Sequence, residues 1–219
     1  MLNTNKQSNN QNIALIGAGV SGNGALLGFS QTLKEGDTLT IFESADEPFK
    51  GFAYQTSHIA LEHSLLGPIS TISTFDKHTE TFANWLNKNK ELVISKIENQ
   101  YSRNTSKVLL KNVVEELRKR SNYDDYYAPR IIYGYYMEAQ AQNIITKMRE
   151  NGVNVNIVKE NVNSIKEKGG FAINDKLYSK VLVANGCVPN EIENQNHVYS
   201  KNIKDKIRDT VIKKVMIQE

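Results

Sequence analysis

The sequence contains a single cysteine, Cys187, which excludes a disulfide bond within the chain. A chain without disulfides suits a reducing compartment. No apolar run approaches the length of a transmembrane helix. The first twelve residues are polar and rich in Asn and Gln, so they are expected to be disordered and to act neither as a secretory signal nor as a membrane anchor. These absences together predict a cytoplasmic protein.

A strong charge of one sign is also lacking. The chain of 219 residues has 27 basic and 24 acidic side chains, which leaves a net charge of +3. This balance gives no reason to expect nucleic acid or an acidic membrane surface as a partner. The four histidines show no metal-ligand spacing, and no nucleophile–base pair or paired carboxylates stand out. We therefore predict no metal site and can name no catalytic residue, which suits chemistry carried by a cofactor.

The most informative segment is an apolar run that leads directly into three glycines. Residues 13–16 read Ile-Ala-Leu-Ile, as expected of a buried parallel strand, and Gly17, Gly19 and Gly22 follow as G-x-G-x-x-G. Gly17 would permit a tight turn, Gly19 would let the backbone approach a pyrophosphate, and Gly22 would let a helix pack closely on the sheet. The N–H groups at the start of that helix would attract phosphate.

An acidic residue follows at the expected distance. Glu43 ends the next predicted strand, about twenty residues after Gly22, where an acid binds the ribose hydroxyls of a dinucleotide. The glycines alone could be a sterically forced connection, and the acid alone could be a solvated strand end. Because no packing rule demands both, the combination predicts a dinucleotide-binding βαβ unit.

Hydrophobic periodicity predicts the remaining elements. Helices are expected over 20–33, 79–97, 104–120 and 130–150, and further strands over 38–43, 153–157 and 180–184. A small antiparallel meander is expected from strands at 162–165, 171–173 and 177–178, with turns at 169–170 and 175–176. The pattern predicts an α/β fold over residues 13–190: a Rossmann-like parallel sheet with a helical insertion at about 76–127 and a small β-meander.

Four segments resemble the bacterial FAD-NAD(P)-binding family, which is related to flavin-dependent monooxygenases and disulfide-reductase-like flavoproteins. The first is the glycine fingerprint with its acid. Residues 47–56 (EPFKGFAYQT) are similar to the family's G-x-A-Y segment, residues 129–136 (PRIIYGYY) to its proline-arginine-x-x-tyrosine-glycine helix start, and residues 183–189 (VANGCVP) to its A-T-G strand end. Two departures are clear: Phe49 replaces a glycine of the family, and Asn185 replaces a threonine.

The resemblance implies an FAD-binding oxidoreductase domain, in which flavin carries the hydride chemistry and the protein orients it. Glu43 would hold the adenosine ribose, Val162 would offer backbone atoms to adenine, and Gly186 would allow close approach of a strand end to the cofactor. The residues that would surround the pyrophosphate are Gly17, Gly19, Ser21 and Gly22.

Two basic residues have alternative interpretations. Lys50, where the family often has arginine, would either approach the phosphates or remain a solvated loop cation. Arg130 would either contact a flavin or nucleotide phosphate or pair with Asp124 or Asp125 at the start of a helix, and we favour the pairing slightly.

The C-terminal segment predicts an incomplete second unit. In the family, a strand similar to residues 211–217 precedes a second glycine fingerprint for NAD(P)H, and here the sequence ends first. Residues 191–219 are therefore expected to be a linker and the truncated start of a second nucleotide-binding unit. NAD(P)H as reductant, an unknown small-molecule substrate and a protein partner that completes the reductant site are further expectations. The alternatives are a degenerate nucleotide-binding module that acts through a partner without turnover, and an NAD(P)-dependent dehydrogenase.

Overall fold

The computed structural model of the protein describes residues 10–55, 80–101 and 107–186. The four histidines, Cys187 and the C-terminal segment 191–219 lie outside these ranges. Within them, no helix is long and apolar enough to cross a membrane. The same ranges contain no group of three His, Cys, Asp or Glu side chains that could hold a metal ion.

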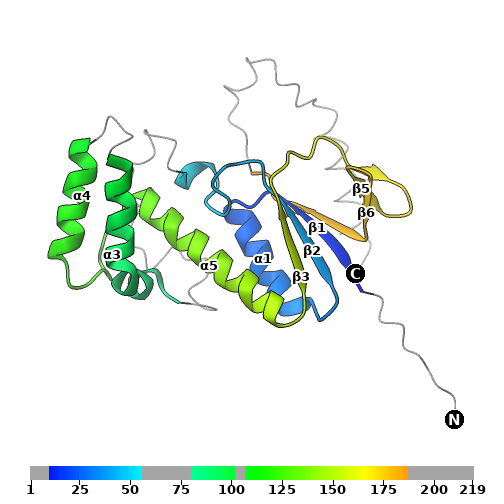
Figure 1. Ribbon diagram of the computed structural model, residues 1–219, viewed down its shortest axis with the longest axis horizontal. Coiled ribbons are helices and arrows are strands. Elements are labelled where there is room, and N and C mark those ends of the chain that lie inside the picture. The colour runs from blue at the N-terminus through cyan, green and yellow to red at the C-terminus, as the bar shows by residue number, and fades with distance from the viewer. Residues whose placement is uncertain (1–9, 56–79, 102–106, 187–219) are drawn as a thin grey trace, which may run out of the picture.

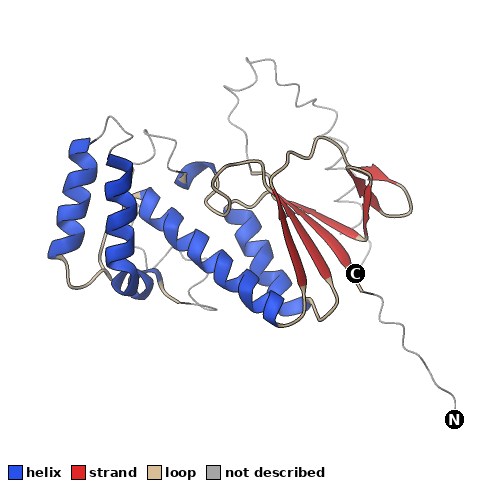
Figure 2. Ribbon diagram, viewed as in Figure 1, coloured by secondary structure: helices blue, strands red, loops and turns tan. Residues whose placement is uncertain are grey.

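Four parallel strands form the central sheet, in the order β3-β2-β1-β7 (Figures 1 and 2). Their bounds are β1 Asn12–Ile16, β2 Thr38–Phe42, β3 Asn154–Val158 and β7 Lys180–Val183. Ile16 lies beside Phe42 and Val183, and Phe42 lies beside Val158. Because the strands run in one direction, their carboxyl ends meet at one edge, where open α/β sheets bind their ligands.

Different layers cover the two faces of this sheet (Figure 1). Helices α1 (Val20–Thr32) and α5 (Arg130–Glu150) pack against each other over one face. The other face carries a three-stranded antiparallel sheet of β4 (Lys166–Glu167), β5 (Phe171–Ile173) and β6 (Lys176–Tyr178). Phe42 meets Tyr178 edge-on between the two sheets, with ring centroids 6.0 Å apart. The predicted Rossmann-like α/β fold with a small antiparallel sheet is confirmed.

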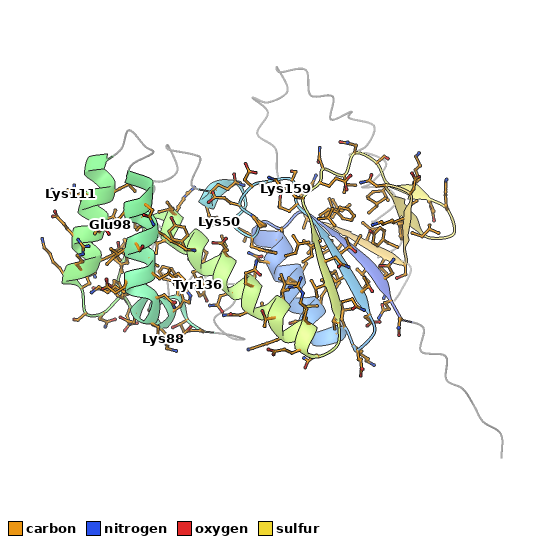
Figure 3. All side chains as sticks on the ribbon, viewed as in Figure 1. Lys50, Lys88, Glu98, Lys111, Tyr136 and Lys159 are labelled. Atoms are coloured by element: carbon orange, nitrogen blue, oxygen red, sulfur yellow. The ribbon has the colours of Figure 1, made fainter. Side chains whose placement is uncertain are left out.

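The predicted helical insertion is a hairpin of α3 (Phe82–Tyr101) and α4 (Lys107–Lys119). It lies at the end of the molecule away from the central sheet and packs on the N-terminal half of α5 (Figure 1). Phe82 and Trp85 of α3 contact Tyr136 of α5 with ring centroids 5.3 and 5.5 Å away (Figure 3 marks Tyr136). The tyrosines of the 129–136 segment are therefore core residues rather than a stacking platform for bases.

The first strand of the small sheet is not at 162–165, as the sequence suggested. Val162 and Ile165 both pack against the cluster that contains Phe42 and Tyr178. Side chains three residues apart point to opposite faces of a strand. The segment is irregular for this reason, and β4 begins directly after it and pairs with β5.

Two boundaries also differ from the prediction. The second turn of the small sheet lies at Asn174 and Asp175, with φ of +49° and +62°, rather than at 175–176. A two-residue hairpin loop needs this pair of left-handed residues, and Asn and Asp tolerate the conformation well. Strand β1 begins at Asn12, inside the segment that was expected to be disordered, because Asn12 pairs with Thr38.

Two glycine substitutions test the helix packing. A Cβ at Gly134 of α5 would lie 2.5 Å from the carbonyl oxygen of Tyr54, in the 3₁₀ turn η1 (Phe52–Tyr54). We expect Gly134→Ala to lower the free energy of unfolding by about 1–3 kcal/mol, because backbone must move. A Cβ at Gly28 of α1 meets nothing within 4 Å, so Gly28→Ala should raise it by about 0.5–1 kcal/mol through helix propensity. Urea unfolding followed by circular dichroism measures both, and a stabilised Gly134→Ala variant would contradict this packing.

Candidate dinucleotide-binding site

The loop between β1 and α1 is fixed by the strands on either side of it. Gly17 has φ +91° and donates its N–H to the carbonyl oxygen of Phe42, 2.8 Å away. A Cβ at Gly17 would lie 2.5 Å from the carbonyl oxygen of Ala184, at the end of β7. A side chain at this position would be strained in its backbone conformation and would collide with the neighbouring strand. Gly17 thus makes the tight turn that the fingerprint predicts.

Helix α1 starts directly against this turn. A Cβ at Gly22 would lie 2.3 Å from the carbonyl oxygen of Gly17, so only glycine permits this approach. Gly19 is the N-cap residue and provides no side-chain cap. Among the described residues, no acceptor satisfies the N–H groups of residues 19–22. The helix start therefore presents free donors and a partial positive charge, both of which suit an anion.

Glu43 connects the glycine loop to the end of β2. One carboxylate oxygen accepts a hydrogen bond from the N–H of Ala18 (2.8 Å), and the other accepts one from the N–H of Ala45 (2.9 Å). The two bonds fix the carboxylate beside the fingerprint loop. A carboxylate has about four acceptor positions, so the described contacts leave room for hydroxyl donors.

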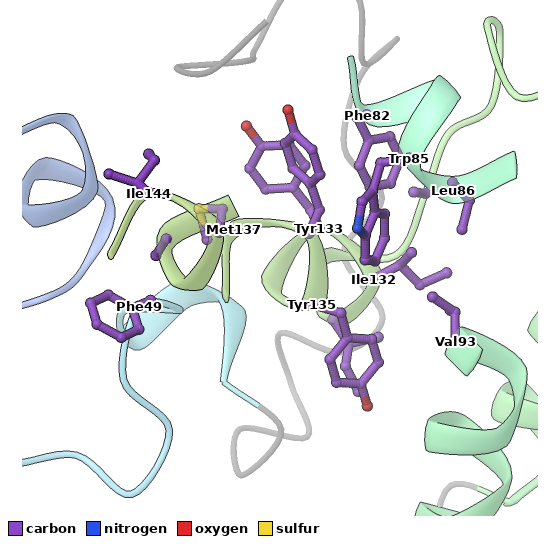
Figure 4. Close-up of a cluster of buried hydrophobic side chains, with 14 of the residues drawn as sticks. Phe49, Phe82, Trp85, Leu86, Val93, Ile132, Tyr133, Tyr135, Met137 and Ile144 are labelled. Carbon is purple, nitrogen blue, oxygen red and sulfur yellow. The ribbon is translucent and has the colours of Figure 1, made fainter. Parts of the chain in front are cut away.

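The second motif, residues 47–56, follows β2, and its described part contains an unusual residue. Phe49 has φ +70°, a left-handed conformation that favours glycine, and its side chain is only 1% exposed. Its ring packs in the main core near Met137 and Ile144 of α5 (Figure 4). The conformation explains why the family has glycine here, and the buried ring shows how a phenylalanine is accommodated.

Asn23 is a site residue that the sequence analysis missed. It is buried on α1, and its side-chain amide donates to the carbonyl oxygen of Phe49, 2.7 Å away. The other amide atom, Oδ1, is buried and has no hydrogen-bond partner among the described residues. The available signal was a polar residue directly after Gly22, on the helix face that packs inward.

The two loops touch at the carboxyl edge of the sheet. A Cβ at Gly51 would lie 3.1 Å from the Cα of Gly19 and 3.4 Å from the backbone nitrogen of Val20. Backbone therefore packs on backbone beside the free donors of α1. A side chain at position 51 would crowd the helix start, and its absence makes a cradle that a phosphate group can approach. Because glycine at position 51 leaves this approach open, the residues present fit a dinucleotide.

Lys50 is not a solvated loop cation, which was one of its two interpretations. The residue is only 3% exposed. Its Nζ lies 2.8 Å from a carboxylate oxygen of Glu47 and 3.7 Å from a carboxylate oxygen of Glu138. The same ammonium lies 4.7 Å from the ring centroid of Tyr135. The solvated interpretation is wrong, because two carboxylates and an aromatic ring enclose the charge.

Arg130 does not form the predicted pair with Asp124 or Asp125. Within the part of the chain that the structure describes, Asp125 pairs with Arg120 at 3.0 Å instead. The Nε of Arg130 is buried, and no residue that the structure describes forms a hydrogen bond with it. Arg120 and Arg130 both lie five residues from Asp125 in the sequence, so spacing alone does not distinguish them, and in the fold Arg120 forms the pair.

The remaining predicted residues lie around the same edge of the sheet. Ser21 is exposed in the first turn of α1. Gly186 is exposed just beyond β7, with φ +70° and open space around its Cα. Val162 is half-buried between β3 and β4, and no described residue forms a hydrogen bond with its backbone.

An ion pair joins the loops that follow β2 and β3. Lys159 donates a hydrogen bond to the carboxylate of Asp46 (Figure 3 marks Lys159). This hydrogen bond and the charge of Lys159 hold the pKa of Asp46 below its ordinary value. Both side chains are exposed, so the pair adds little to stability. Its effect is to neutralise two charges at the edge of the sheet beside Glu43.

Comparison with known proteins agrees with this geometry. The profile of the FAD-NAD(P)-binding family matches residues 14–182, from β1 to β7. No curated protein matches the chain. The matched span contains both loops of the cradle, Glu43 and the first turn of α5. The chain therefore belongs to the FAD-NAD(P)-binding family, whose cofactors are FAD and NAD(P).

Proposed function

We propose that this domain binds FAD at the carboxyl edge of its sheet and forms the flavin-carrying part of an oxidoreductase that acts on a small molecule. The contact between Gly19 and Gly51 beside the uncapped start of α1 is the observation that carries the proposal. A pyrophosphate must approach backbone donors closely, and glycine at positions 19 and 51 places no side chain between the two loops.

The chain's own residues would bind and orient the cofactor. Glu43, already fixed by Ala18 and Ala45, would accept hydrogen bonds from the adenosine ribose. The free backbone of Val162 would face adenine, and Gly186 would let the strand end approach the cofactor. FAD, when bound, supplies the hydride and electron transfer. NAD(P)H is the proposed reductant, delivered at a site that a protein partner completes.

A degenerate module that binds nucleotide without turnover is the second candidate. The observation that favours it is the 47–54 loop, where Phe49 stands in place of glycine and carboxylates surround Lys50. The two candidates differ in one property, which is whether bound flavin accepts electrons from NAD(P)H.

Visible absorbance of the purified protein separates these candidates. We expect the spectrum of bound oxidised flavin after addition of FAD and removal of the excess, because the cradle is already formed in the fold. Anaerobic NADPH, with NADH in parallel, should bleach that spectrum if the domain works as an oxidoreductase. Bound flavin that does not bleach would favour the module without turnover. Absence of bound flavin would contradict the proposed function.

Substitutions in the fingerprint separate cofactor binding from folding. A Cβ at Gly19 would meet only the Cα of Gly51, at 3.4 Å, so Gly19→Ala should fold but place a methyl group in the cradle. We expect its Kd for FAD to rise at least about tenfold, or about 1.4 kcal/mol. Gly22→Ala should instead lower the free energy of unfolding by about 1–3 kcal/mol, because its Cβ collides with backbone.

Flavin fluorescence titration and urea unfolding measure the two effects, with Gly28→Ala on the open face of α1 as the control. If Gly19→Ala bound FAD as tightly as the unsubstituted protein, the pyrophosphate could not lie between the two loops.

A further inference from the structure

We infer that Lys50 is a positioning residue of the cofactor site: its ammonium holds the 49–51 loop against α5, keeps Gly51 beside Gly19, and does not itself bind phosphate. The inference rests on the proposed FAD site and assigns Lys50 a role within it. It departs from the expectation that a basic residue in this motif reaches the phosphates.

The burial of Lys50 is the first argument. It is the one buried lysine or arginine in the described ranges. An ammonium is rarely removed from water unless nearby groups compensate its charge. Glu47, Glu138 and the ring of Tyr135 provide this compensation, at 2.8, 3.7 and 4.7 Å. The charge of Lys50 is thus used inside the fold (Figure 3 marks its position).

The placement of these partners is the second argument. Glu47 belongs to the same loop as Lys50, three residues earlier, whereas Tyr135 and Glu138 belong to α5. The ammonium therefore joins the loop to a long helix packed in the core. A buried ion pair that loses one partner is strongly destabilised, so the link is well suited to hold a loop in place.

The neighbours of Lys50 show what the link positions. The carbonyl oxygen of Phe49 is held from α1 by Asn23, and Gly51 packs against Gly19 and Val20. Phe49 is in a left-handed conformation that persists only where the surroundings impose it. Lys50 is the middle of these three residues, so loss of its link to α5 would let Gly51 shift relative to the N–H donors of α1.

Electrostatics disfavours a direct phosphate contact. To reach a phosphate, the ammonium would have to leave both carboxylates, or the phosphate would have to approach Glu47 and Glu138. The first event separates Glu47 from the ammonium 2.8 Å away, and the second brings like charges together beside a lysine side chain that is 4% exposed. The two roles therefore predict opposite effects when the charge of Glu47 is removed. The affinity for FAD should rise if Lys50 binds phosphate, and it should fall if Lys50 positions the loop.

Three variants and two measurements test this inference. Lys50→Met removes the ammonium, and Glu47→Gln weakens the interaction of the ammonium with residue 47. Lys96→Met is the matched control, since Lys96 lies 3.6 Å from Glu138 and 4.9 Å from the Tyr135 centroid but comes from α3. The Kd for FAD is measured by fluorescence titration. Hydrogen–deuterium exchange of residues 44–55 is measured without FAD, with the β1 and β2 peptides as internal reference.

We expect Lys50→Met to raise the Kd at least about tenfold and to increase exchange in residues 44–55, with the reference peptides unchanged. Glu47→Gln should raise the Kd and the exchange of residues 44–55 as well, but by smaller amounts. Lys96→Met should change the Kd by less than about twofold, because it removes only an exposed ion pair. Unchanged or tighter FAD binding in Glu47→Gln, with weaker binding in Lys50→Met, would overturn the inference in favour of a phosphate contact. Unchanged exchange and affinity in Lys50→Met would overturn it outright.

Two further results have defined meanings. If Lys50→Met does not fold, as judged by circular dichroism, the direction in which Glu47→Gln changes the Kd for FAD decides between a phosphate contact and a positioning role. If the unsubstituted protein binds no FAD, the proposed function fails, and the exchange data alone decide whether Lys50 holds the loop.

Discussion

The carbonyl oxygen of Gly17 lies 2.3 Å from the point that a Cβ at Gly22 would occupy, and the rest of the site depends on this contact. Because the turn and the helix start are in direct backbone contact, α1 begins at the carboxyl edge of the sheet, and its first N–H donors bind no acceptor in the described ranges. The same packing recurs between Gly19 and Gly51, which brings the loop after β2 to the helix start. Two close approaches of backbone thus shape the cradle, and each depends on a glycine that carries no side chain.

Backbone contacts alone do not fix the loops, because glycine leaves the backbone free to adopt many conformations. Polar side chains from outside each loop supply the restraint. Glu43 holds the fingerprint loop through Ala18, and Asn23 and Lys50 hold the second loop from α1 and α5. Each of these bonds joins segments that are far apart in the sequence, so the cradle depends on the assembled fold rather than on either motif alone.

This dependence explains how much the sequence could predict. The helices, the parallel strands and the fingerprint turn follow from local periodicity and glycine spacing, and they were predicted correctly. The burial of Lys50 and the inward position of Asn23 depend on contacts with distant segments, which no local pattern contains. Arg130 was assigned a wrong partner because Asp125 pairs with Arg120, which lies equally close to it in the sequence. The irregular 162–165 segment was missed because apolar residues there suggested a strand, although their spacing places both on one side.

Phe49 shows how the chain departs from its family and still keeps the shape of the site. A left-handed residue other than glycine costs about 1–2 kcal/mol. Burial of a phenylalanine side chain contributes about 1.5–3 kcal/mol, and this ring is 1% exposed in the core formed with α5. The two terms are of similar size, so the substitution is offset within the same residue. The φ of +70° is retained while Asn23 holds the carbonyl oxygen of Phe49 and Gly51 packs against Gly19. A change that removes the family's glycine therefore leaves the loop conformation intact and adds a hydrophobic anchor beside the cofactor cradle.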